Sequence, residues 1–166
     1  EASIPLHSEG NLLDSLDLSI NRAIELVRPL VPLDRSITEL VDRFALVCWS
    51  NLVEPGDSTA QILIQSLGAD SALAILARAV TSQEHPRIPE FPVELTQKQL
   101  EDAFERWRPR FDAKRFRSSF DVLGKIGSRV ITNKDSEWPA GLNDLGWHAP
   151  LLLFARGGSL DVCSQS

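Results

Sequence analysis

Apolar residues recur at helical spacing near the start of the chain. Between residues 11 and 28 they fall three or four positions apart, which is the spacing of one helix face. The apolar positions are Leu12, Leu13, Leu16, Ile20, Ala23, Ile24 and Val27. Pro29 and Pro32 stop the pattern, because proline lacks the backbone donor that a helix interior needs. The spacing predicts an amphipathic helix over 11–28.

A second helix is marked at both of its ends. Ser36 and Glu39 form an S-x-x-E capping box, in which each side chain satisfies a free backbone N–H of the first turn. The apolar face that follows consists of Ile37, Leu40, Val41, Phe44, Ala45 and Cys48. Residues 54–57 (EPGD) end this helix, since proline restricts the residue before it and glycine permits a tight turn. Asp57 or Ser58 can cap the helix that comes next.

Two short helices and an extended segment follow this turn. The patterns over 58–67 and 70–80 predict a compact helical hairpin, in which Gly68 supplies the permissive backbone of a helix C-terminus. Between residues 82 and 94, three prolines remove backbone donors and favour extended backbone. We therefore expect a proline-rich linker after the hairpin.

Two more helical patterns come after the linker. Thr96 and Gln99 offer another capping box, and the apolar face behind it consists of Leu100, Ala103, Phe104 and Trp107. Pro109 ends or kinks that helix. The last helical face consists of Phe116, Phe120, Leu123 and Ile126, and it finishes at Gly127. The chain is therefore mainly helical up to Gly127.

The pattern changes after Gly127. Residues 129–132 (RVIT) and 151–155 (LLLFA) are short runs typical of β-strands. The second run is apolar at five consecutive positions, which is typical of a strand buried on both faces in a parallel α/β sheet. Two strands alone are marginal in water, so this sheet needs further neighbours.

Composition and cysteine content narrow the class of protein. The chain has 166 residues, of which 43% are hydrophobic and 24% charged, an ordinary balance for a folded domain. No apolar run approaches eighteen residues and the first ten residues lack a basic segment, so we expect neither a membrane span nor a signal peptide. Cys48 and Cys163 make neither a disulfide framework nor a metal site. These features favour a cytoplasmic protein without a cofactor, a metal or a small-molecule ligand.

Charge is unevenly spread along the chain. The net charge is −6, yet residues 101–129 hold eight lysines and arginines against five acids. A basic segment of this kind is a possible auxiliary contact to DNA phosphates. Its candidate residues are Arg106, Arg108, Arg110, Lys114, Arg115 and Arg117. The alternative is a solvated surface in which interleaved acids pair with some of these cations.

The C-terminal part carries a resemblance to a known family. In residues 129–158 (RVITNKDSEWPAGLNDLGWHAPLLLFARGG), a D-x-x-[YW]-P-x-x-L motif is filled by Asp135, Trp138, Pro139 and Leu142. A second pattern is filled by Ala149, Pro150, Leu151, Leu153 and Gly157. This segment resembles the start of the sheet domain of the DNA-processing family called DprA or Smf. Residues 44–76 resemble the helical N-terminal part of its actinobacterial members.

The resemblance implies a fold and a division into domains. It implies a helical module, similar to a sterile-alpha-motif or helix-hairpin-helix domain, followed by the first strands of a truncated Rossmann-like α/β domain. We expect an N-terminal extension over 1–35, a helical domain over 36–127 and the start of the Rossmann-like domain over 128–166. The family's glycine-rich phosphate-binding turn would follow residue 166, so the chain resembles an N-terminal fragment.

The resemblance also implies a function. Members of the family bind and protect incoming single-stranded DNA and help load the RecA recombinase during natural transformation, usually as dimers, and they are not known as catalysts. This chain lacks the glycine-rich turn that offers backbone N–H groups to a phosphate, so we expect no tight binding of single-stranded DNA. The predicted hairpin is a weak match to a DNA-binding helix-hairpin-helix, because its turn keeps one glycine, Gly68.

Three alternatives stay open on the sequence. Trp138 and Pro139 could form a stacking platform for an unpaired base, or the tryptophan could anchor the core. The whole chain could be a helical protein-interaction module that does not bind nucleic acid. In that case the apolar edge at 151–155 invites strand pairing with a second copy. A hydrolase is disfavoured, since no nucleophile elbow or HExxH motif is present.

Overall fold

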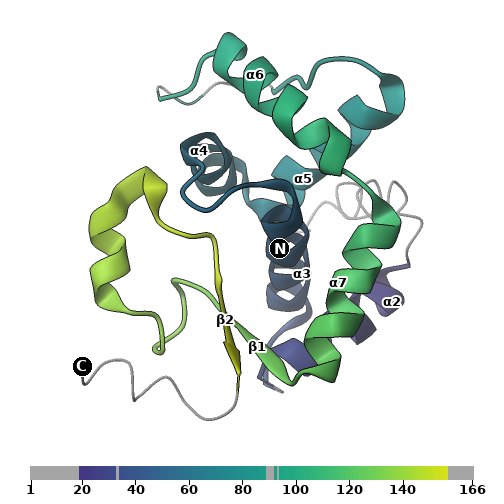
Figure 1. Cartoon of the computed structure of the whole chain (residues 1–166), viewed down its shortest axis with the longest axis vertical. Helices are drawn as coiled ribbons and strands as arrows, with labels where there is room; N and C mark the ends of the chain where they lie inside the picture. The colour runs from purple at the N-terminus through teal and green to yellow at the C-terminus, as the bar shows by residue number, and fades with distance from the viewer. Residues whose placement is uncertain (1–18, 33, 89–91, 93, 157–166) are drawn as a thin grey trace, which may run out of the picture.

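The computed structural model describes residues 19–32, 34–88, 92 and 94–156, and it is mainly helical with one small antiparallel sheet (Figure 1). The α-helices of this part are α2 (Ile20–Val27), α3 (Ile37–Leu52), α4 (Ser58–Leu67), α5 (Ala69–Ser82), α6 (Gln97–Trp107) and α7 (Ala113–Lys125). The 3₁₀ segments are η1 (Arg28–Leu30), η2 (Arg108–Arg110) and η3 (Ala140–His148). The strands are β1 (Ser128–Ile131) and β2 (Leu153–Arg156).

Helix starts follow the predicted caps. The Ser36 side chain accepts the backbone N–H of Glu39 at 3.3 Å, and Asp57 accepts that of Ala60 at 3.1 Å. Thr96 and Gln99 make the full reciprocal capping box at the start of α6. Of the helix expected over 11–28, residues 11–18 lie outside the described part, and α2 begins at Ile20. The three caps confirm the predicted starts of α3, α4 and α6, and such caps are predictable because they involve residues close in sequence. The prediction of one continuous helix over 11–28 is wrong at Ser19, which has extended backbone and caps α2 by accepting the backbone N–H of Arg22 at 3.2 Å.

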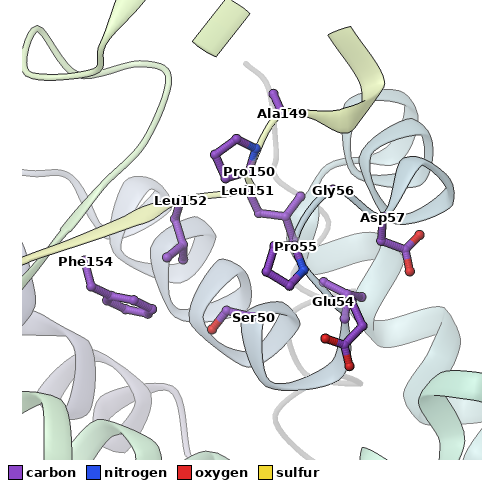
Figure 2. Close-up of a pocket in the computed structure, with 11 residues that line it drawn as sticks. Ser50, Glu54, Pro55, Gly56, Asp57, Ala149, Pro150, Leu151, Leu152 and Phe154 are labelled. Carbon is purple, nitrogen blue, oxygen red and sulfur yellow. The ribbon is translucent and has the colours of Figure 1, made fainter. Parts of the chain in front are cut away.

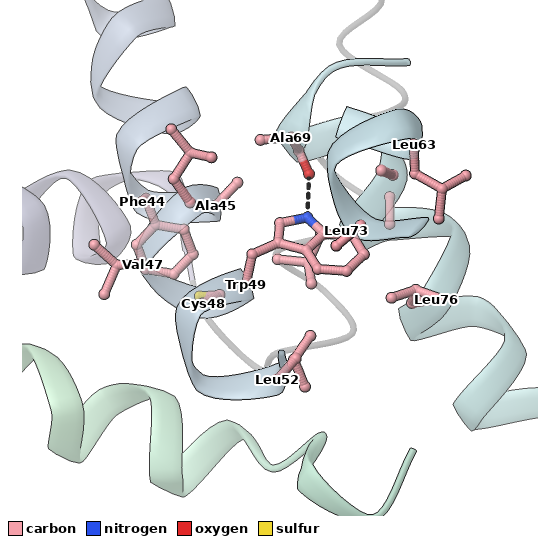
Figure 3. Packing of buried hydrophobic residues seen from close by; sticks show 14 of the residues in the cluster. Phe44, Ala45, Val47, Cys48, Trp49, Leu52, Leu63, Ala69, Leu73 and Leu76 are labelled. Atoms are coloured by element: carbon pink, nitrogen blue, oxygen red, sulfur yellow. Dashed lines mark hydrogen bonds between the residues drawn. The ribbon is translucent and has the colours of Figure 1, made fainter. Parts of the chain in front are cut away.

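Helix α3 lies at the centre of the helical module, and α2, α5 and α7 surround it (Figure 1). It is buried on nearly every side, whereas the sequence pattern predicted one apolar face. Figure 3 shows Trp49 of α3 pointing at α5, where its indole N–H donates to the Ala69 carbonyl at 2.9 Å. The ring of Trp107 meets that of Trp49 edge to face, with 5.2 Å between the ring centroids. Cys48 of the same helix is fully buried, and this burial raises the pKa of its thiol.

Helices α4 and α5 are the two helices of the predicted compact hairpin, and they meet at a sharp corner. Gly68 joins them with φ +88°, a backbone conformation that favours glycine, and the two helices are bent by 113° at this break. No single helix of the described part is long and apolar enough to cross a membrane, although this bent pair meets those criteria jointly by length and composition.

The two strands pair antiparallel, with Val130 opposite Phe154 and Ile131 opposite Leu153. The expectation of a parallel-type strand buried on both faces over 151–155 is therefore wrong. Strand β2 starts at Leu153, and Phe154 stays 43% exposed. The more buried strand is β1, because one of its faces packs on the helical core and the other on η3 and the preceding loop. An apolar run reports hydrophobicity, but it does not say which neighbours will cover it.

The main core is continuous from α2 to the segment just before β2. Its buried members include Ala23 of α2, Phe120 of α7, Val130 of β1 and Leu152. It therefore extends across the boundaries predicted at 35/36 and 127/128. A second, smaller cluster holds Ile131, Trp138 and Ala155. Within the described residues the strands thus pack on the helical module, and the division into domains stays a prediction.

Candidate functional site

The acidic residue of the D-x-x-[YW]-P-x-x-L motif is bound by an arginine of the central helix. Asp135 lies in the turn after β1, and Arg43 projects from α3 with a side chain that is 2% exposed. The two terminal guanidinium nitrogens of Arg43, Nη1 and Nη2, donate to the two carboxylate oxygens of Asp135 at 2.6 and 2.8 Å. This two-pronged geometry is the strong form of an arginine–carboxylate pair. It fastens the motif to the helical module.

Two further contacts complete the ligation of this carboxylate. The backbone N–H of Thr132 donates to Asp135 at 2.8 Å, and Arg35 donates at 3.1 Å. Burial by itself raises the pKa of Asp135. The hydrogen bonds from Arg43 and Thr132 and the charges of Arg43 and Arg35 outweigh that effect, so the pKa lies below its ordinary value. Asp135 is therefore an ionised structural residue at neutral pH.

The remaining motif residues pack around the sheet. Trp138 is buried at 9% exposure against Ile131 and Ala155, with Leu142 at the edge of the same cluster. Its indole N–H donates to Asn143 at 3.3 Å. The core-anchor interpretation of Trp138 is thus confirmed. Pro139 caps η3 and Pro150 precedes β2, whereas Gly157 lies outside the described residues.

Arg43 was missed by the sequence reasoning. It occupies a position off the predicted apolar face of α3, where a charged residue is expected in solvent. The available signal was the neighbouring sequence, since apolar residues flank Arg43 closely enough for the helix to be buried all round. A buried arginine requires an acidic partner. The sequence does not say that the partner is Asp135.

A second titratable group lies next to this ion pair. Burial raises the pKa of Asp42; Lys134 at 3.8 Å and Arg43 lower it, and Asp70 adds to the rise. In the part of the chain that the structure describes, no group of three or more histidines, cysteines and acids is placed to hold a metal ion. Among the described residues, this arrangement is a network of paired charges around Asp135.

The structure divides the six candidate DNA-contact residues into two sets. The first three are neutralised: Arg106 faces Asp57 at 3.5 Å, Arg108 faces Glu105 at 3.0 Å, and Arg110 faces Glu54 at 2.6 Å. Lys114, Arg115 and Arg117 lie on the first turns of α7, and none has a carboxylate partner within the described residues. The segment is thus partly a paired surface and partly a group of free cations.

An apolar pocket of about 250 Å³ lies beside β2. Most of its walls come from the turn at 54–57 and from residues 149–152 and 154, and Ser50 and Val53 complete the lining (Figure 2). Gln61 holds the second segment in place by donating to the Ala149 carbonyl at 2.9 Å, and His148 hydrogen-bonds the Gly56 carbonyl at 3.0 Å. Phe154 lies at one end of the pocket (Figure 2).

The edge of β2 beside this pocket is open within the described residues, because β1 is the neighbour that β2 has there. Sequence reasoning had pointed to the apolar edge at 151–155 but not to the pocket. The proline and glycine at 54–57 predicted the end of a helix. They did not predict the pocket, because the distance between this turn and Pro150 depends on the tertiary fold. Comparison of the chain with protein-family models, curated proteins and solved structures found no match.

Proposed function

We propose that the chain is the N-terminal part of a DprA-like DNA-processing protein. In this proposal the whole protein binds and protects incoming single-stranded DNA and assists RecA loading in natural transformation, without a catalytic role. The observation that carries it is the Arg43–Asp135 pair, in which the first residue of the family-like motif binds a buried arginine of α3. The motif joins the helical module to the strands that follow.

The other motif positions support this proposal. Trp138 and Leu142 pack on the face of the sheet opposite the helical core, against Ile131 and Ala155. Each residue type of the motif therefore has a physical role, since a carboxylate meets a buried arginine and a large aromatic ring covers a sheet face. A segment built in this way can support a larger sheet.

The distribution of charge supports a limited role in DNA contact for this part of the protein. The net charge is −6, and three of the six candidate cations are neutralised by acids. Long-range repulsion of a polyanion therefore opposes the few cations that remain free. In the proposal, the main phosphate contacts of the protein come from a glycine-rich turn after residue 166.

Recombinase loading by the encoded protein tests this function. We expect the full-length gene product to bind single-stranded DNA and to raise several-fold the ATPase activity of a RecA-type recombinase on DNA covered by single-strand binding protein. The 166-residue chain alone should leave that rate unchanged, because it offers no glycine-rich phosphate turn. A full-length product that neither binds the DNA nor raises the rate would contradict the proposal.

A second candidate function is a protein-interaction module that self-associates. It is favoured by the 43% exposure of Phe154 next to an apolar pocket, on a strand edge that no other described strand covers. Open strand edges offer unpaired backbone groups to a second strand. In this candidate, β2 of one copy pairs with β2 of another.

Light scattering after size-exclusion chromatography tests self-association. We expect reversible dimers with a dissociation constant on the order of tens of micromolar, because a small interface gives weak binding. We expect Phe154→Asp to abolish these dimers. Leu145→Asp is the matched control, since Leu145 is 49% exposed on η3 and does not line the pocket. A strictly monomeric wild type, or equal effects of both variants, would rule this candidate out.

A further inference from the structure

The outer face of α7 carries cations that the fold does not neutralise. Within the described residues, Lys114, Arg115, Arg117 and Lys125 have no ion-pair partner, while ion pairs hold Arg106, Arg108 and Arg110. Helix α7 lies at the outside of the helical module (Figure 1). Its Phe116 and Phe120 are buried in the core. The structure thus separates free cations from paired ones, which their spacing in sequence could not do.

The free cations share one side of the helix. Lys114 and Lys125 are eleven positions apart, which is about three turns, so they lie on the same face about 17 Å from each other. Arg115 and Arg117 flank this line. Asp112 is the N-cap residue of α7, and its side chain accepts the backbone N–H of Lys114 at 2.9 Å. Asp121 lies one turn from both Arg117 and Lys125 on the same side of the helix, and within the described residues no ion pair joins it to either.

Helix stability does not explain this placement of charge. The N-terminus of a helix carries the positive end of its dipole, so cations in the first turns are unfavourable there. Lys114, Arg115 and Arg117 occupy those turns. No described acid offsets their charge by pairing with it. A bound anion would relieve this repulsion.

We propose that the α7 cationic face, defined as Lys114, Arg115, Arg117 and Lys125, binds the phosphate backbone of single-stranded nucleic acid. This inference rests on the proposed function for its biological setting. The cations are spread along the helix, which suits a flexible polyanion that needs spaced charges. Val122 and Ile126, exposed at 56% and 42%, lie among them and can contact sugars and bases.

A protein partner fits this face less well. Stable protein interfaces have a buried apolar core in which aromatic anchors fill pockets of the partner. The large exposed apolar residues of the α7 face are two aliphatic side chains, Val122 and Ile126, which are one helical turn apart, and this pair includes no aromatic anchor. An acidic peptide is therefore the competing occupant that the experiment must exclude.

Fluorescence anisotropy with the 166-residue chain and a labelled oligothymidylate tests the proposal. At about 20 mM salt we expect weak binding, with a Kd on the order of 10⁻⁴ M. Three phosphate contacts predict a slope of about −2 for log K against log salt concentration. The triple variant Lys114→Gln, Arg115→Gln and Arg117→Gln should bind at least about tenfold more weakly and lose most of that slope.

The matched control removes the same amount of charge from paired positions. It combines Arg22→Gln, Arg106→Gln and Arg108→Gln, whose cations are held by acids. Both variants have the same net charge, so a purely global effect would weaken binding equally in both. We expect the control to lose less than about threefold, and far-ultraviolet circular dichroism to be unchanged in both.

Three results would overturn the α7 proposal. They are an absence of binding at millimolar chain concentration, equal losses in the two variants, and binding of polyglutamate in place of the oligonucleotide. The recombinase assay of the full-length protein is read independently. If it succeeds while the α7 variant binds normally, the site is wrong and the function stands. If α7 binds DNA but the full-length protein loads no recombinase, the function is wrong and the site stands.

Discussion

Replacing Arg43 by alanine is expected to lower the free energy of unfolding by about 3–5 kcal/mol. The reason is that Asp135, whose side chain is 9% exposed, loses both hydrogen bonds from the guanidinium of Arg43. A carboxylate left buried without its main partner costs far more than a pair at the surface. Urea unfolding followed by tryptophan fluorescence measures this change. The same loss should loosen the turn after β1, where the N–H of Thr132 also donates to Asp135.

Arg35→Ala is the control for this variant. Arg35 donates to the same carboxylate at 3.1 Å, but its side chain is 31% exposed, so we expect a loss below about 1 kcal/mol. A loss below about 1 kcal/mol for Arg43→Ala as well would show that water replaces the guanidinium, and that the pair does not fasten the motif.

Arg43→Ala should also change how the stability of the chain depends on pH. The pKa of Asp135 in the folded chain lies below its unfolded value of about 3.9. Its contribution to stability is therefore present above pH 4 and is lost as the pH falls through the folded value. Arg43→Ala removes most of that contribution, so the variant and the wild type should differ less in stability at acidic pH than at pH 7.

Replacing Trp49 by alanine is the second large effect we expect, a loss of about 3–5 kcal/mol. Trp49 is 0% exposed between α3 and α5 and meets Trp107 at 5.2 Å. Its removal leaves a cavity at the centre of the helical module (Figure 3). It also leaves the Ala69 carbonyl without the indole donor at 2.9 Å. Circular dichroism during urea unfolding is the measurement, since the variant changes the fluorescence signal.

Two further variants separate packing from hydrogen bonding at this position. Trp49→Phe keeps much of the apolar volume but removes the donor, so we expect it to lose about 1–3 kcal/mol. Trp147→Ala is the control, because Trp147 is a half-buried residue at the margin of the same core and should cost less than Trp49→Ala. Similar losses for Trp49→Ala and Trp147→Ala would contradict a central role for Trp49.

Local rules predicted the helices and several of their ends. Ser36, Asp57 and Thr96 act as N-caps where the sequence placed them, because a cap satisfies backbone groups two or three residues away. Gly68 ends α4 with φ +88° for a similarly local reason. The sequence grouped the six candidate cations as one basic segment, and their contact with DNA stays a prediction.

Local sequence rules did not predict how the two strands are arranged. The run at 151–155 is apolar, and β2 does form there, but its direction, its start at Leu153 and the exposure of Phe154 were not predictable. Pairing direction depends on the path of the chain between the strands, and burial depends on which elements cover each face. The pocket beside β2 follows from the same packing.

For this protein, the sequence by itself determined where α3, α4 and α6 begin and which residue types fill the motif, because those properties rest on contacts within a few positions. Only the tertiary structure decided that Asp135 meets Arg43, 92 positions away. It also decided that Arg106, Arg108 and Arg110 are neutralised, while the α7 cationic face has no ion-pair partner among the residues that the structure describes. The charge of a segment can be counted from its sequence. The electrostatic field at the surface also depends on which charges the fold brings within pairing distance.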